Sequence, residues 1–235
     1  MYHKKRRKAR SKNKNKGGRA KKENICLKKK IWLQKVKLAY FDGRGIAEPA
    51  RLILHFAKVD FEDFRFTHEQ WPEIKPKTKT GKAPYLEFDG HTLVESYAIF
   101  RFLARKYGLA GKGEYEEALV DAIADIQKDF RTSVSTWLYV KMGYRPGNAD
   151  ELKKPHFYDA VETYIPLLLN YLKESKSGFL APSGLTWADF TVSEFLITIL
   201  QEESTILDKY PEMKEYLKRV KSIPELKEYY SSRKE

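Results

Sequence analysis

The chain has 235 residues, of which 42% are hydrophobic, so it can bury a core in one large or two small domains. Its one cysteine, Cys26, excludes an internal disulfide and any cysteine-rich metal site, and fits a reducing compartment. No apolar run approaches the roughly 18 residues of a membrane-spanning helix. We therefore expect a cytoplasmic protein without a membrane span.

The net charge of +13 comes from the N-terminus. Residues 1–37 hold 17 lysines and arginines against one acid, Glu23, which leaves 28 basic and 31 acidic residues in the rest of the chain. Because runs of like charge cannot bury enough apolar surface, we expect residues 1–35 to form a basic disordered tail. Three interpretations of it stay open: a solvated extension, a nuclear-localisation signal in KKRRKARSK, or a weak arm on nucleic acid or anionic membrane.

The first elements after the tail predict a strand, a helix and a second strand. The segments are KVKLAYF (35–41), GIAEPARLILHFAKV (45–59) and FEDFRF (61–66). Pro49 lies in the first turn of the helix, where its missing N–H costs no hydrogen bond. Two strands joined by a helix predict parallel pairing with a right-handed crossover.

A short irregular piece, a hairpin and a helix follow. The segment PYLEFDGHTLVE (84–95) alternates like two strands around Asp89-Gly90, which is a strong signal for a two-residue turn. The segment SYAIFRFLARKYG (96–108) has helical period and ends at a glycine. Residues 36–110 therefore predict a small α/β domain.

After GLAGKG (108–113) only helices are predicted, which assigns residues 113–235 to an all-α domain. The start of one of these helices is well specified by a capping box. Thr186 can cap the helix, and Asp189, the third helical residue, can accept in return from the backbone N–H of Thr186. The four predicted helices are YEEALVDAIADIQKDFRTSVSTWLYVKM (115–142), HFYDAVETYIPLLLNYLKES (156–175), LTWADFTVSEFLITIL (185–200) and PEMKEYLKRVKSI (211–223).

Four short motifs carry a resemblance to a known family. The tyrosine of KLAYFDGRG (37–45), WPEIK (71–75), GKAP (81–84) and ES (95–96) stand in the order and spacing of cytosolic glutathione transferases, and LTWADF (185–190) follows in the helical half. The chain most resembles the sigma class in its invertebrate form, from about residue 36 to the C-terminus.

The resemblance implies a thioredoxin-like domain that binds glutathione and a helical domain that walls the site of a hydrophobic electrophile. It also implies a homodimer, a role in detoxification, glutathione as co-substrate and no tightly bound cofactor. Phe130 to Tyr139 and the C-terminal segment are the expected walls.

Tyr40 is the expected catalytic residue, because a hydroxyl after this strand can point at the sulfur of glutathione. A free thiol has a pKa of about 8.5, and lowering it by about 2 units requires about 2.7 kcal/mol. One hydrogen bond to a charged group supplies about 1.5–3 kcal/mol, so a single donor is enough. The alternative is a core tyrosine with a satisfied hydroxyl. The GRG turn lacks the spacing of a dinucleotide-binding loop.

The resemblance assigns glutathione-binding roles to residues of the three other motifs. Pro84 matches the cis-proline of the family, and Ala83 before it would pair with the backbone of the ligand. Ser96 begins a helix, whose free N–H groups favour a carboxylate, and Glu95 can accept the α-ammonium. The alternatives are a strand-opening proline and plain helix capping.

Further side chains would hold the ends of the peptide. Trp71, Lys75 and Lys82 would hold the glycyl end through the indole N–H and positive charge, although isolated lysines are usually solvated. Asp129 matches an acid that reaches across the dimer to the partner's ligand, with a plain surface position as the alternative. Arg44 would support the thiolate or pair with an acid.

The chain departs from the pattern of the sigma class at three positions. Ile46 stands where some members have an arginine near the sulfur. Thr136 and Lys128 stand where the prostaglandin D synthase branch has a tryptophan and a metal-binding aspartate, so prostaglandin isomerisation and metal activation are not expected, and we predict no metal. The competing functions are a glutathione-dependent isomerase or peroxidase, or a non-catalytic binding or structural relative.

Overall fold

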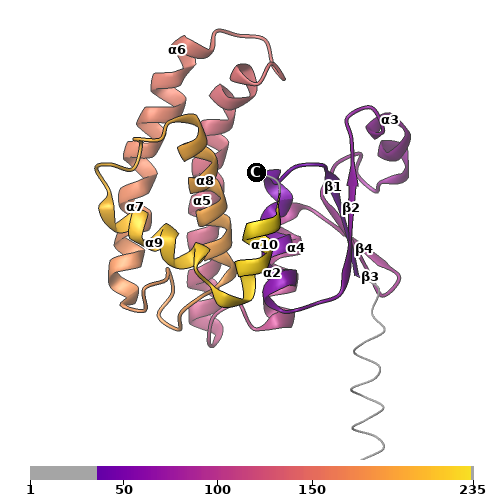
Figure 1. Cartoon of the computed structure of the whole chain (residues 1–235), viewed down its shortest axis with the longest axis horizontal. Coiled ribbons are helices and arrows are strands. Elements are labelled where there is room, and N and C mark those ends of the chain that lie inside the picture. The colour runs from indigo at the N-terminus through magenta and orange to yellow at the C-terminus, as the bar shows by residue number, and fades with distance from the viewer. Residues whose placement is uncertain (1–35, 234–235) are drawn as a thin grey trace, which may run out of the picture.

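The computed structural model describes residues 36–233, and the predicted tail, residues 1–35, lies outside the described residues. The N-terminal part contains a four-stranded sheet in the order β2-β1-β3-β4 (Figure 1). Strand β1 pairs parallel with β2 and antiparallel with β3, and β3 pairs antiparallel with β4. The predicted parallel pairing and the predicted hairpin are both confirmed. The strands are β1 (Val36–Phe41), β2 (Phe61–Phe66), β3 (Tyr85–Phe88) and β4 (His91–Val94).

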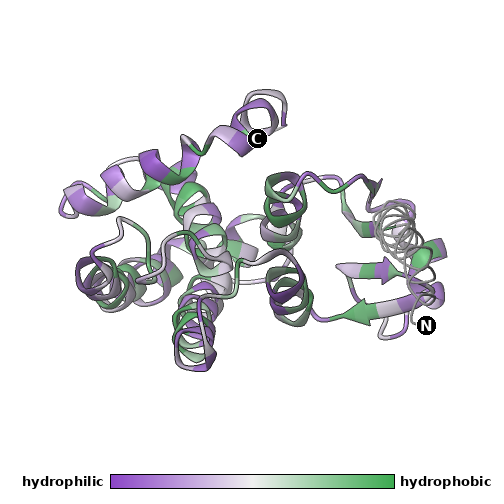
Figure 2. Cartoon of the chain, turned by 90° about the horizontal axis from the view of Figure 1, so that it is seen from below, coloured by the Kyte–Doolittle hydropathy of each residue, from purple (hydrophilic) through white to green (hydrophobic). Residues whose placement is uncertain are grey.

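Helices cover both faces of this sheet. Helices α2 (Glu48–Phe56) and α4 (Ser96–Tyr107) lie between the sheet and the helical half (Figure 2). The short helix α3 (Trp71–Ile74), which the sequence predicted as irregular, packs on the opposite face with a smaller apolar cluster. Side chains alternate accordingly, since Leu38 joins the main core and Ala39 joins the smaller cluster.

The predicted turn chemistry is confirmed. Asp89 and Gly90 both have positive φ, 48° and 78°, as a two-residue hairpin turn requires. Gly108 ends α4 in the left-handed conformation with φ of 76°, and Pro49 lies in the first turn of α2.

The second half of the chain is helical, as predicted. Its main core is continuous with the core under α2 and α4, and α2 packs against α8. Among residues 36–233 no helix has the length and apolar character to cross a bilayer. The helices are α5 (Glu114–Lys141), α6 (Ala149–Lys153), α7 (Asp159–Ser175), α8 (Trp187–Glu202), α9 (Pro211–Lys221) and α10 (Lys227–Ser232).

Three details differ from the sequence prediction. One turn of π-helix (Lys154–Tyr158) precedes α7 where a uniform α-helix was expected. Helices α6 and α10 were not predicted, because five or six residues are too few to show a helical period.

The capping box of α8 is confirmed and is part of a buried polar cluster. The fully buried carboxylate of Asp189 accepts from the N–H of Thr186 at 2.7 Å and from its hydroxyl at 3.0 Å. It also accepts from the N–H of Leu180 at 2.9 Å and the hydroxyl of Tyr216 at 3.1 Å. Burial raises the pKa of Asp189 to about 6, and these four donors oppose that shift.

We predict that Asp189→Ala lowers the free energy of unfolding by about 3 kcal/mol or more, because buried donors lose their only strong acceptor. Urea denaturation at pH 7 measures the change. The matched control is Glu215→Ala, which removes an exposed carboxylate bonded to Lys218. Equal, small effects of the two substitutions would contradict the role of this cluster.

Candidate active site

The topology of the sheet brings separate segments of the chain to one edge. Strand β1 ends there, β3 begins there and β4 ends there, because β3 is antiparallel to both. Tyr40 in β1, Pro84 before β3 and Glu95 after β4 therefore lie at the same edge, and Trp71 follows the parallel strand β2 on that side. The register that fixes this alignment pairs Ala39 with Tyr85 and Tyr85 with Val94.

The hydroxyl of Tyr40 is held by the turn that follows β1. It accepts a long hydrogen bond of 3.4 Å from the backbone N–H of Ile46, so its own proton can be donated elsewhere. Gly45, with φ of 46°, passes so close that a Cβ there would lie 2.6 Å from the hydroxyl. Burial raises the pKa of Tyr40, whereas the Ile46 N–H and the charge of Arg131 lower it. The phenol is therefore a neutral donor at pH 7.

Two backbone segments at the same sheet edge as Tyr40 have unusual backbone geometry. The Ala83-Pro84 bond is cis, as the resemblance implied. Glu95 has φ of 68°, a strained value for a residue with a side chain, and stands as the N-cap of α4. The side chain of Glu95 makes no capping hydrogen bond to this helix. The first N–H groups of α4 have no partner within the helix.

The remaining predicted residues of the N-terminal half lie at the periphery of this edge. Trp71 is half-buried and stacks on Phe66 with ring centroids 5.4 Å apart. Lys75 and Lys82 are both exposed. The side chain of Lys75 passes over Gly81, within 3.4 Å of where a Cβ would stand, so it lies against the GKAP segment.

Two predicted residues lie elsewhere. Asp129 is exposed on α5 and is not part of the sheet edge. Arg44 donates to Glu194 of α8 at 3.1 Å and also to Gln201, so of its two predicted roles the structure shows pairing with an acid.

The predicted wall of the electrophile site needs a correction. Phe130, Val134 and Trp137 are at most 2% exposed and pack inside the helical core, because the helical period turns them away from the sheet. Tyr139, which follows these residues in α5, is half-buried. Its ring contacts Tyr144, with centroids 6.3 Å apart.

Two fully buried charged residues behind the Tyr40 turn, Glu48 and Arg51, were not predicted from the sequence. Arg51 donates to the carboxylate of Glu48 at 2.9 Å, to the carbonyl of Gly43 at 2.8 Å and to Asp63 at 3.0 Å. A local signal for this ion pair was present in the sequence. Glu48 and Arg51 stand three residues apart in a helix whose other buried residues are apolar.

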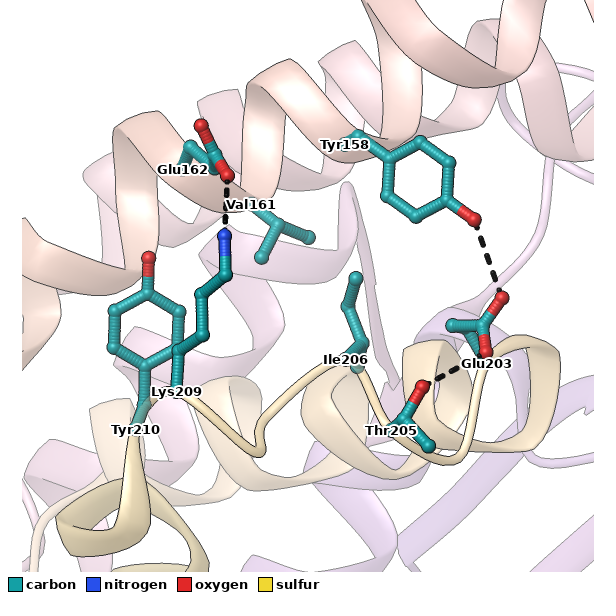
Figure 3. Close-up of a pocket in the computed structure, with 8 residues that line it drawn as sticks. All are labelled: Tyr158, Val161, Glu162, Glu203, Thr205, Ile206, Lys209 and Tyr210. Atoms are coloured by element: carbon teal, nitrogen blue, oxygen red, sulfur yellow. Dashed lines mark hydrogen bonds and ion pairs between the residues drawn. The ribbon is translucent and has the colours of Figure 1, made fainter.

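A cleft of about 260 Å³ lies on the helical half, away from these residues (Figure 3). Its charged groups are paired with each other, as Lys209 with Glu162 at 3.0 Å and the hydroxyl of Tyr158 with Glu203 at 3.2 Å. Val161 and Ile206 lie between these pairs (Figure 3). It therefore shows no group directed at a reacting ligand.

Within the described residues no group of three or more His, Cys, Asp or Glu side chains is placed to hold a metal ion. The independence of metal stays a prediction.

Comparison with known proteins decides the family. Residues 36–105 match the N-terminal domain of the glutathione S-transferases, and residues 128–233 match their C-terminal domain. Probable glutathione S-transferase 5 of Caenorhabditis elegans is 39% identical over 199 residues, which cover 84% of this chain and 96% of that protein. The chain belongs to the glutathione S-transferase family.

Solved structures of this family superpose over most of the chain. Monomeric Na-GST-3 of the hookworm Necator americanus has a TM-score of 0.81 and 42% identity, covering 86% of this chain and 98% of that one. A Nu-class enzyme of Haemonchus contortus has a TM-score of 0.79 and 40% identity, covering the same shares. The thioredoxin-like domain followed by a helical domain is thus confirmed. Glutathione conjugation, with glutathione as co-substrate and no tightly bound cofactor, is supported by the family.

We predict that Gly45→Ala lowers kcat/KM at least tenfold, which corresponds to about 1.4 kcal/mol of barrier. The added Cβ would meet the Tyr40 ring at 2.6 Å and would strain a backbone with positive φ, so the hydroxyl must move. Turnover of glutathione with chlorodinitrobenzene measures the loss.

Gly43→Ala is the matched control, because a Cβ there meets nothing within 4 Å. Near-normal turnover of both variants would show that the position of the tyrosine hydroxyl does not depend on the turn.

Proposed function

We propose that Tyr40 activates glutathione by donating a hydrogen bond to its thiolate, which then attacks a hydrophobic electrophile. The observation that carries the proposal is the state of the Tyr40 hydroxyl. It lies at the edge of the sheet, remains protonated at neutral pH and accepts from the Ile46 N–H, so its single proton is available to a ligand.

The energy of one such bond fits the chemistry required. A charge-assisted hydrogen bond contributes about 1.5–3 kcal/mol, and a fall of about 2 units in the thiol pKa requires about 2.7 kcal/mol. Arg131 adds a positive charge that stabilises an anion near Tyr40. No protein nucleophile or general base is needed.

The sheet edge supports the proposed binding of the tripeptide. The backbone groups of Ala83, before the cis-Pro84, would pair with the cysteinyl unit. The N-terminus of α4 at Ser96 would hold the γ-glutamyl carboxylate, and Glu95 its ammonium group. Trp71, Lys75 and Lys82 would hold the glycyl end.

Aromatic rings from both halves of the chain support a preference for aromatic electrophiles. His68 stacks on Phe41 with centroids 4.6 Å apart, and Tyr144 of the segment after α5 lies 5.9 Å from His68. Tyr139 extends this row on the helical side. Such rings favour planar apolar partners.

We also propose that the chain belongs to the sigma class in its invertebrate form, on the basis of the motifs around Tyr40. Its proposed role is detoxification in the cytoplasm. The alternative location is the nucleus, reached through an address signal in the basic tail. Residues 36–110 would form the glutathione-binding domain and residues 113–235 the helical domain. Prostaglandin H₂ is the substrate that tests for isomerase activity. Its conversion to the D₂ isomer would contradict the expectation, drawn from Thr136, that this chain does not isomerise prostaglandins.

We predict that Tyr40→Phe lowers kcat/KM at pH 7 roughly 10- to 100-fold, because the thiolate loses a bond of about 1.5–3 kcal/mol. The wild-type rate should rise with pH to a plateau, since burial raises the Tyr40 pKa and keeps the phenol protonated. The variant's rise should shift to higher pH. Chlorodinitrobenzene and an aliphatic enal, compared in the same assay, test the aromatic preference.

An unchanged pH profile in Tyr40→Phe would remove this residue from the mechanism. Absence of turnover in the wild-type protein, together with retention on a glutathione column, would instead favour the non-catalytic relative.

We further propose a homodimer through the face formed by α4 and α5. Phe102 and Leu93 line a surface hollow of about 640 Å³ there. Arg101 bridges α4 to Asp121 of α5 at 3.1 Å, so charged groups surround this apolar centre. Asp129 lies on the exposed side of the same α5 and would reach the partner's ligand.

We predict that Phe102→Glu shifts the protein to a monomer in sedimentation velocity, because it places a charge in the apolar centre. The control is Leu167→Glu, which changes a leucine of α7 that is 43% exposed. A wild-type protein that sediments as a monomer, like the relative described as monomeric, would overturn the dimer.

A further inference from the structure

A buried arginine near the C-terminus joins carboxylates from both halves of the chain. Nη1 of Arg233 lies 3.0 Å from Oε1 of Glu48 in α2 and 2.9 Å from Oε1 of Glu194 in α8. The three side chains are between 1% and 4% exposed. A single guanidinium nitrogen thus bridges two acids that would otherwise repel each other in a buried place.

The last helix brings this arginine into position. Helix α10 lies beside α2 (Figure 1), and its Tyr229 stacks on His55 with ring centroids 4.0 Å apart. The Tyr229 hydroxyl donates to Glu48 at 2.7 Å. Arg233 follows directly after α10, so the helix holds it against the start of α2.

Each of the two carboxylates also fixes an arginine that contacts the turn after β1. Glu194 accepts from Arg44, which lies in the turn itself, at 3.1 Å. Glu48 accepts from Arg51 at 2.9 Å, and Arg51 donates to the carbonyls of Gly43 at 2.8 Å and Arg44 at 3.3 Å.

That turn determines where the Tyr40 hydroxyl lies. The Ile46 N–H donates to its oxygen, and Gly45 passes against it. A continuous chain of ion pairs and hydrogen bonds therefore runs from Arg233, through Glu194 and Glu48, to the turn and the phenol.

Loss of the Arg233 bridge between Glu48 and Glu194 would change how these carboxylates hold Arg51 and Arg44. Burial raises the pKa of Glu194, Arg233 is the largest charge that lowers it, and Glu48 raises it further. Without Arg233, Glu194 would keep only Arg44 and Glu48 would keep only Arg51 as an arginine partner. The two carboxylates would then repel each other. The other charged or titratable groups near these carboxylates are Asp63 and Arg65, which lie beside Arg51, and Tyr229 and Tyr230 of α10.

We propose that Arg233 is a positioning residue for the reaction: by bridging Glu48 and Glu194 it holds Arg44 and Arg51 on the turn that places the Tyr40 hydroxyl. The inference rests on the proposed role of Tyr40 and adds to it a dependence on the C-terminal segment.

The test compares Arg233→Ala with wild type in the pH dependence of kcat/KM for glutathione and chlorodinitrobenzene. The ultraviolet absorbance of the enzyme-bound thiolate is titrated in parallel. We expect the pKa of the bound thiol to rise by about 0.5–1 unit, and kcat/KM at pH 7 to fall about 3- to 10-fold, with recovery at alkaline pH. Arg233→Lys, which keeps a cation with several donors, should restore most of the shift.

The matched control is Arg219→Ala, which removes an exposed arginine of α9 that donates to the Gly178 carbonyl, and its thiol pKa should equal that of wild type. If Arg233→Ala does not fold, Arg233→Gln, which keeps an amide donor, is measured in its place. An unshifted thiol pKa in folded Arg233 variants overturns the inference, even where thermal stability falls.

Tyr40→Phe is measured alongside to separate the two proposals. If Tyr40→Phe raises the thiol pKa and the Arg233 variants do not, only the inference on Arg233 fails. If Tyr40→Phe leaves the thiol pKa unchanged, the role of the phenol fails, and with it the basis of the inference.

Discussion

The hydrogen bond from the Ile46 N–H to the Tyr40 oxygen is the contact on which the proposed chemistry depends. A phenol has one proton and two lone pairs, and a donor already placed on the oxygen leaves the proton to point at a ligand. At 3.4 Å this bond is long, and a Cβ on Gly45 would lie 2.6 Å from the hydroxyl, so the position of the turn limits where the hydroxyl can lie. The turn therefore has to be held from outside.

The buried charges behind the turn supply that support at an energetic cost. Burying a carboxylate is unfavourable unless it is paired and hydrogen-bonded, and both Glu48 and Glu194 meet that condition through arginines. The arginines come from α2, the turn and the end of the chain, while the acids come from both halves. Because α2 packs on α8 in one continuous core, the position of Tyr40 depends on how the two halves fit together.

Local patterns predicted most of the fold. The hairpin turn at Asp89-Gly90, the end of α4 at Gly108 and the cap at Asp189 each depend on neighbours within a few residues, so sequence was sufficient for them. Other features were missed or wrong. Residues 130–139 were predicted as part of the wall of the site, and three of them, Phe130, Val134 and Trp137, lie in the core, because the periodicity shows that a face is apolar but not which neighbour covers it. The five-residue helix α6 was too short to detect.

The sequence by itself determined the order of the strands and of the longer helices and the tyrosine before its glycine turn, since adjacent residues encode these. It also carried the family resemblance, which implied the cis-proline. Only the tertiary structure decided that Tyr40, Pro84 and Glu95 share one sheet edge, because strand register sets that. It also decided that Arg233 lies between Glu48 and Glu194. Those partners are 185 and 39 residues away from Arg233, and the need to neutralise buried charge brings them together without leaving a local pattern.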